Sequence, residues 1–230
     1  MTGAPARDAE GAVDRATSIG WPRHLAGLTL SYLFFHHVGT MLEPLGEIGD
    51  TRWADWVDLV TPYALVGFAA LTLTAASASR RQWAVFGVAA VMYTQGHGIH
   101  LAANSVGNVA KSDIAHFWDE YFGHYVWYVG LALMFAVLAT ALADRPPPER
   151  AGIAHTLALL VGWTHFTNSI EGQFALPGFA IAAGFAFWGL RTRANAGRLL
   201  LTAYGFSFAL FVVFGVWHRG FPEFSELGWI

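Results

Sequence analysis

The chain of 230 residues contains no cysteine. This absence excludes disulfides, thiolate nucleophiles and every metal site that depends on cysteine ligands. Charged residues are also scarce, at 13% of the chain, which is about half the share of an ordinary soluble domain. The net charge is only −3 and no run of basic residues occurs. Nothing in the composition would attract nucleic acid, so we expect no nucleic-acid partner.

The residues that are present are strongly apolar. Hydrophobic residues make up 55% of the chain, and apolar stretches long enough to cross a bilayer recur along it. Such stretches are typical of transmembrane helices rather than of a buried soluble core. We therefore predict an all-α, polytopic integral membrane protein whose main partner is the lipid bilayer.

Breaks between the apolar stretches divide the chain into candidate spans. The clearest break is residues 143–150, "ADRPPPER", because three consecutive prolines cannot continue a helix. We expect a bundle of seven transmembrane helices in one domain, residues 21–230, after a disordered cytoplasmic tail, residues 1–20. The predicted spans are residues 24–44, 54–78, 82–104, 112–142, 151–170, 173–192 and 197–218.

The basic residues predict the orientation of this bundle. Only Arg52, Lys111 and Arg219, out of 13 basic residues, fall on the side opposite the N-terminus. Because cytoplasmic loops carry an excess of Lys and Arg, the N-terminus is expected to be cytoplasmic and the C-terminus extracytoplasmic, in a plasma membrane of the bacterial type. The basic residues on the N-terminal side are Arg7, Arg15, Arg23, Arg80, Arg81, Arg145, Arg150, Arg191, Arg193 and Arg198.

Histidines gather at the extracytoplasmic ends of the predicted spans. Eight of the ten histidines lie there, although the spans are distant in sequence and alternate in direction. An ionisable side chain inside a membrane is costly, so this convergence indicates a functional site. The eight residues are His36, His37, His97, His100, His116, His124, His165 and His218.

The span 112–142 carries the densest group of these polar residues. In a regular α-helix, His116, Glu120 and His124 would form one stripe, because they are four residues apart, and Asp119 would flank it. Histidines one turn apart, facing a carboxylate on another helix, are typical of metal sites in helix bundles. We predict that His97, His100, His116, His124 and His165 bind a metal and that Glu120 and Asp119 are catalytic.

Histidine and carboxylate ligands without sulfur suit a divalent transition metal, with zinc expected and iron or copper as alternatives. A zinc-bound water next to a carboxylate base would hydrolyse a lipid or another apolar substrate. The sequence leaves open an iron or copper oxidoreductase, a haem-binding electron carrier, a transporter and a purely structural polar network. It also leaves open whether His36, His37, Glu171 and His218 belong to the site.

Overall fold

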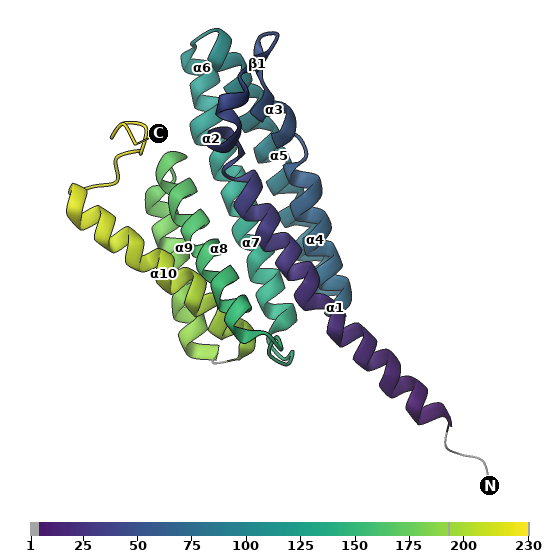
Figure 1. Ribbon diagram of the computed structural model, residues 1–230. Coiled ribbons are helices and arrows are strands. Elements are labelled where there is room, and N and C mark those ends of the chain that lie inside the picture. Colours follow the sequence, from purple (N-terminus) through teal and green to yellow (C-terminus); the bar gives the residue numbers. More distant parts are fainter. Residues whose placement is uncertain (1–4, 193, 230) are drawn as a thin grey trace.

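The computed structural model describes residues 5–192 and 194–229, with side chains described from Gly20 onward, and is all-α apart from one short hairpin (Figure 1). The helices are α1 (Pro5–Phe35), α2 (Val38–Leu42), α3 (Trp53–Asp58), α4 (Thr61–Ala75), α5 (Arg80–Val109), α6 (Asp113–His116), α7 (His124–Leu142), α8 (Ala151–Glu171), α9 (Ala175–Thr192) and α10 (Asn195–His218). A 3-10 turn, η1 (Glu43–Leu45), precedes the antiparallel strands β1 (Glu47–Ile48) and β2 (Thr51–Arg52), and a π-helix, η2 (Phe117–Gly123), joins α6 to α7.

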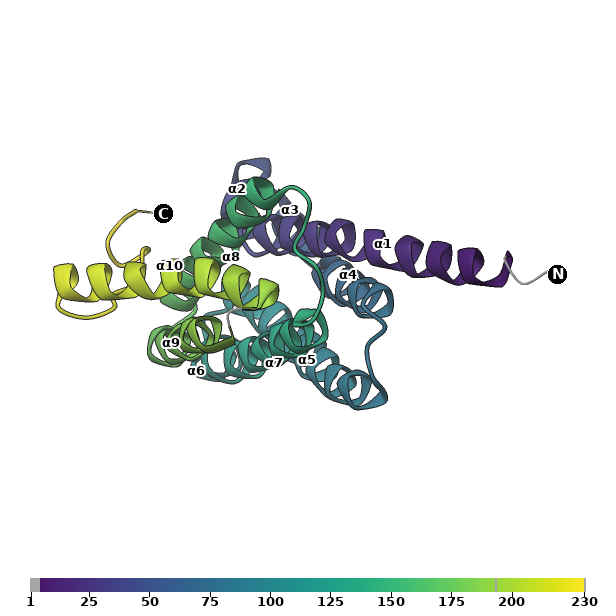
Figure 2. The ribbon, with the colours of Figure 1, turned by 90° about the horizontal axis from the view of Figure 1, so that it is seen from below.

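The long helices pack in two groups. One hydrophobic core lies among α1, α4, α5 and α7, and includes Leu28, Leu65, Tyr93 and Met134. A second core lies among α8, α9 and α10, and is rich in phenylalanine. Viewed along the bundle, α1 and α8 lie on one side and α5 and α7 on the other (Figure 2).

Successive long helices alternate in direction, so polar segments that are distant in sequence meet at one end. The connections from α4 to α5 and from α7 to α8 lie at the lower end in Figure 1. The short elements α2, α3 and α6 lie at the upper end. The three prolines of residues 146–148 fall in the α7–α8 connection, where the sequence predicts a break.

Three helical stretches are long and apolar enough to cross a membrane, namely Trp53–Ala75, Asp113–Leu142 and Asn195–His218. Gly20–Phe35 together with Val38–Leu45 makes a fourth if this pair, bent by 59°, counts as one span. The described residues therefore provide three or four candidate spans rather than the predicted seven. Helix α5 is not apolar enough to count as a candidate span, because its C-terminal half carries polar residues, among them His97 and His100.

The first predicted span, residues 24–44, is not one straight helix. Helix α1 ends at Phe35, and the chain bends at His36 and His37 before α2 begins. The disordered tail, residues 1–20, falls partly outside the described residues, and the backbone is helical from Pro5 onward. The tail and the single domain stay predictions.

Glycines bring α5 and α7 into backbone contact beside the candidate site. A Cβ atom on Gly96 would collide with the backbone nitrogen of Trp127, and one on Gly123 would lie 2.9 Å from the backbone nitrogen of His100. Small residues allow this close approach in membrane helices, where the packing of backbones drives association. The approach fixes the distance between His100 on α5 and the first turn of α7.

Candidate metal centre

The π-helix η2 determines which side chains of the segment 113–142 face the site. The backbone N–H of His124 donates to the carbonyl oxygen of Asp119, five residues earlier. A π-turn therefore stacks residues five apart, whereas an α-turn stacks residues four apart, and π-turns are frequent at functional sites. Asp119 and His124 consequently lie together on the side that faces α5.

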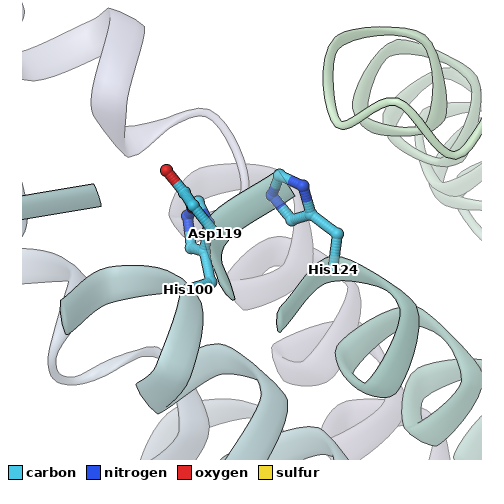
Figure 3. A group of neighbouring side chains, drawn as sticks. All are labelled: His100, Asp119 and His124. Carbon is cyan, nitrogen blue, oxygen red and sulfur yellow. The ribbon is translucent and has the colours of Figure 1, made fainter. Parts of the chain in front are cut away.

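His100, Asp119 and His124 form a group of ligand atoms that could hold a metal ion (Figure 3). One nitrogen of each histidine and one carboxylate oxygen all lie within 4.8 Å of one another. The Nδ1 atom of His100 lies 2.5 Å from Oδ1 of Asp119. His100 is partly buried, and Asp119 and His124 are buried. This group is called the triad below.

Glu120 lies next to the triad. Its Oε2 atom is 3.1 Å from Nδ1 of His124, but the two atoms are not aligned for a hydrogen bond. Among the residues that the structure describes, both atoms are buried without a hydrogen-bond partner. Buried polar atoms in folded proteins nearly always have a partner, and a bound ion or water commonly supplies it. This pair therefore supports an ion or water at the triad.

The expected stripe of His116, Glu120 and His124 forms only in part: Glu120 lies beside His124, whereas His116 stays outside the triad, because η2 interrupts the α-helical register. His116 is exposed and its ring packs against Tyr121, with 5.8 Å between the ring centroids. Asp119, expected to flank the stripe, belongs to the triad instead. The expected stripe requires four-residue spacing throughout this segment, and nothing in the residue pattern of the segment marks the π-turn.

His97 lies beside the triad but pairs with a different carboxylate. Its Nε2 atom is 3.1 Å from Oδ1 of Asp58, which also accepts a hydrogen bond of 2.5 Å from the hydroxyl of Thr61. The ring of His97 lies 6.3 Å from that of His100. Asp58 is the polar partner that sequence reasoning missed. The sequence places both residues near the same end of alternating helices, but it does not show that they pair.

His165 lies outside the triad, in the second core. Its Nε2 atom donates to the backbone carbonyl oxygen of Gly178, 2.9 Å away, and its ring packs on Tyr204 and Phe211. His37, whose role the sequence left open, lies 3.1 Å from the hydroxyl oxygen of Thr167 and so links the end of α1 to α8. The structure brings neither histidine to the triad.

Trp127 occupies the centre of the polar cluster, and sequence reasoning gave it no role. Its ring centroid lies 4.9 to 5.6 Å from the ring centroids of His36, His97, His100 and His124. Both ring nitrogens of His36 and the indole nitrogen of Trp127 are buried without a partner among the described side chains. The wall behind the triad is therefore aromatic. The nitrogen atoms of His36 and Trp127 in this wall have no hydrogen-bond partner among the described side chains.

The donor set of the triad determines which ions it can take. Two imidazoles and one carboxylate match a catalytic zinc site, which has three protein ligands and an open fourth position. The same donors suit iron and copper.

No protein-family model, no curated protein and no solved structure matches this chain.

Proposed function

We propose that the chain is a membrane-embedded, metal-dependent hydrolase whose zinc ion is held by His100, Asp119 and His124. The observation that carries the proposal is the convergence of three ligand atoms within 4.8 Å of one another, from α5, η2 and α7. A metal ion explains why two imidazoles and a carboxylate are brought together in a chain with so few charged residues.

A zinc ion in such a site lowers the pKa of a bound water to about 7. The protein's own contribution is to hold the three ligands and to supply a group that accepts the proton of the water. Glu120 is placed for that role, because its buried Oε2 atom lies beside His124 and has no hydrogen-bond partner among the described residues. Asp119 is then a ligand, and Glu120 the general base.

The expected orientation places the triad at the extracytoplasmic end. The positive-inside distribution puts ten of the 13 basic residues at the other end of the predicted helices. The triad would then lie near the outer boundary of the hydrocarbon core, where a hydrolysable bond of a lipid can reach it. A lipid ester or amide is therefore the proposed substrate class.

Hydrolysis by the reconstituted full-length protein tests this proposal. The protein is placed in phosphatidylcholine vesicles with a fluorogenic long-chain acyl ester, and the rate is measured before and after treatment with a zinc chelator. We expect the chelator to abolish hydrolysis and added zinc to restore it. Absence of hydrolysis by the zinc-loaded protein, or a rate that the chelator leaves unchanged, overturns the hydrolase proposal for this substrate class.

A second candidate is an iron or copper oxidoreductase at the same triad. The aromatic surroundings favour it, because the ring of Trp127 stacks on His124 and on Tyr128, with centroid separations of 5.6 and 5.0 Å. Extended aromatic contacts of this kind offer a path for electrons to a redox-active metal. Iron or copper in the purified protein, with oxygen consumption in the presence of a reductant and no ester hydrolysis, would support this candidate over the hydrolase.

A further inference from the structure

A large cavity lies in the half of the bundle opposite the triad. Its volume is about 650 Å³, within the range of pockets that hold small molecules. Helices α1, α7, α8 and α10 surround it, and Figure 2 looks along the bundle from this end. The lining residues that come from α7 and α8 belong to the halves adjoining the α7–α8 connection, whereas His124 of the triad stands at the other end of α7.

The wall of the cavity is mostly apolar and its charges are confined to one end. Leu28, Phe135 and Leu138 are typical of the lining. The charged lining residues are Arg23, Glu149 and Arg150, all near the cytoplasmic ends of the predicted helices. The cavity therefore has an apolar body and an end with two arginines and one glutamate.

We propose that this cavity binds one anionic phospholipid, with an acyl chain between α1, α7, α8 and α10 and its phosphate at Arg23 and Arg150. An arginine guanidinium matches phosphate geometry through paired N–H donors. Basic pockets between membrane helices on the cytoplasmic side bind anionic headgroups for this reason. The apolar body of the cavity accounts for the chain, and the excess of one positive charge at its end accounts for the headgroup.

This site is independent of the metal centre. No residue of the triad lines the cavity. The lipid at this site therefore has a binding or structural role and is distinct from a substrate that would reach the triad at the other end. Loss of the metal proposal would leave this one standing, and each has its own measurement.

Native mass spectrometry of the full-length protein counts the lipids that it retains. The detergent-solubilised protein is titrated with phosphatidylglycerol, phosphatidylcholine, oleate or glycerol phosphate. We expect one phosphatidylglycerol to be retained most tightly, and glycerol phosphate, which has no acyl chain, not to be retained. Equal retention of phosphatidylglycerol and phosphatidylcholine, or tightest retention of oleate, contradicts recognition of an anionic phospholipid.

Matched variants locate the bound lipid. Arg23→Gln and Arg150→Gln should each weaken phosphatidylglycerol binding about fivefold, while Arg81→Gln, an exposed arginine outside the cavity, should leave it unchanged. Ala26→Phe fills the cavity and should abolish retention, whereas Ala84→Phe on the exposed face of α5 should not. Circular dichroism and elution volume establish that each variant is folded. Folded Arg23, Arg150 and Ala26 variants that bind like their controls overturn the proposal.

Discussion

The Nδ1 atom of His100 lies 2.5 Å from Oδ1 of Asp119, although the two residues are on different helical segments, α5 and η2. An imidazole N–H donates a hydrogen bond to a carboxylate oxygen at this distance, and a metal ion can take the place of that proton. With His124 beside them, the pair becomes a three-ligand group. A metal-binding role differs from a purely structural hydrogen bond in what substitutions at these residues do to zinc affinity.

Replacing His100 by alanine should remove one of the three ligands. Zinc affinity, measured by competition with a chromophoric chelator, should fall at least about 100-fold, because even residues that only support a ligand typically cost 10- to 100-fold. His116→Ala is the matched control, since His116 is exposed and outside the triad. If both variants bind zinc as tightly as the wild type, His100 is not a ligand.

Asp119→Asn and Glu120→Gln should have different effects, although the two residues are adjacent. Asp119→Asn should weaken zinc binding, because an amide is a poorer zinc ligand than a carboxylate. Glu120→Gln should retain zinc and lose about 10²- to 10⁴-fold of the hydrolysis rate, the usual contribution of a general base. Zinc content and ester hydrolysis are measured on the same preparations. Loss of zinc from Glu120→Gln, with Asp119→Asn unaffected, would reverse the assigned roles.

Adding a residue to the π-turn should take Asp119 away from His124. An alanine inserted after Tyr121, an exposed residue of η2, would place Asp119 six residues before His124, so that neither an α-turn nor a π-turn stacks the two residues. Zinc affinity should fall about as far as in His100→Ala, while the helical circular dichroism signal is retained. An alanine inserted after Asp50, an exposed residue next to β1, serves as the control. A Tyr121 insertion that keeps wild-type zinc affinity would show that the register of η2 does not build the site.

Gly96→Ala should destabilise the contact between α5 and α7. The added Cβ would collide with the backbone of Trp127 and lie 2.8 Å from the carbonyl oxygen of Gly123, and such overpacking typically costs about 1–3 kcal/mol. Gly98→Ala on the same helix is the control, because a Cβ there has no neighbour within 4 Å. Thermal unfolding in detergent micelles should show a lower midpoint for Gly96→Ala only. Equal midpoints would mean that α5 and α7 are not in backbone contact at this point.

The sequence predicted the positions of the helices and the end of the bundle at which polar residues gather. Hydropathy and prolines locate helix ends, because both act locally along the chain. Because the helices alternate in direction, the sequence alone predicts that His100 and His124 lie at the same end of the bundle. The number of candidate spans was overestimated, since α5, α8 and α9 form helices of sufficient length but are not apolar enough to count as membrane spans.

The detailed geometry of the site could not be predicted from regular α-helical spacing along the sequence. The four-residue spacing of a regular α-helix predicted that His116 and His124 lie on the same face, whereas the π-turn places Asp119 on the face of His124. The partner of His97, Asp58, lies 39 residues away on another segment. Such pairings follow from the relative rotation of two helices about their axes, which is set by packing and has no local signature in the sequence.

Elemental analysis of the purified wild-type protein measures directly whether the triad holds a metal ion. The full-length protein is extracted in detergent without chelator, dialysed against metal-free buffer and analysed for zinc, iron and copper, beside the variant in which His100 is alanine. We expect about one equivalent of a transition metal in the wild type and little in the variant. Less than about a tenth of an equivalent in the wild type, even after incubation with zinc, would contradict a metal site at His100, Asp119 and His124.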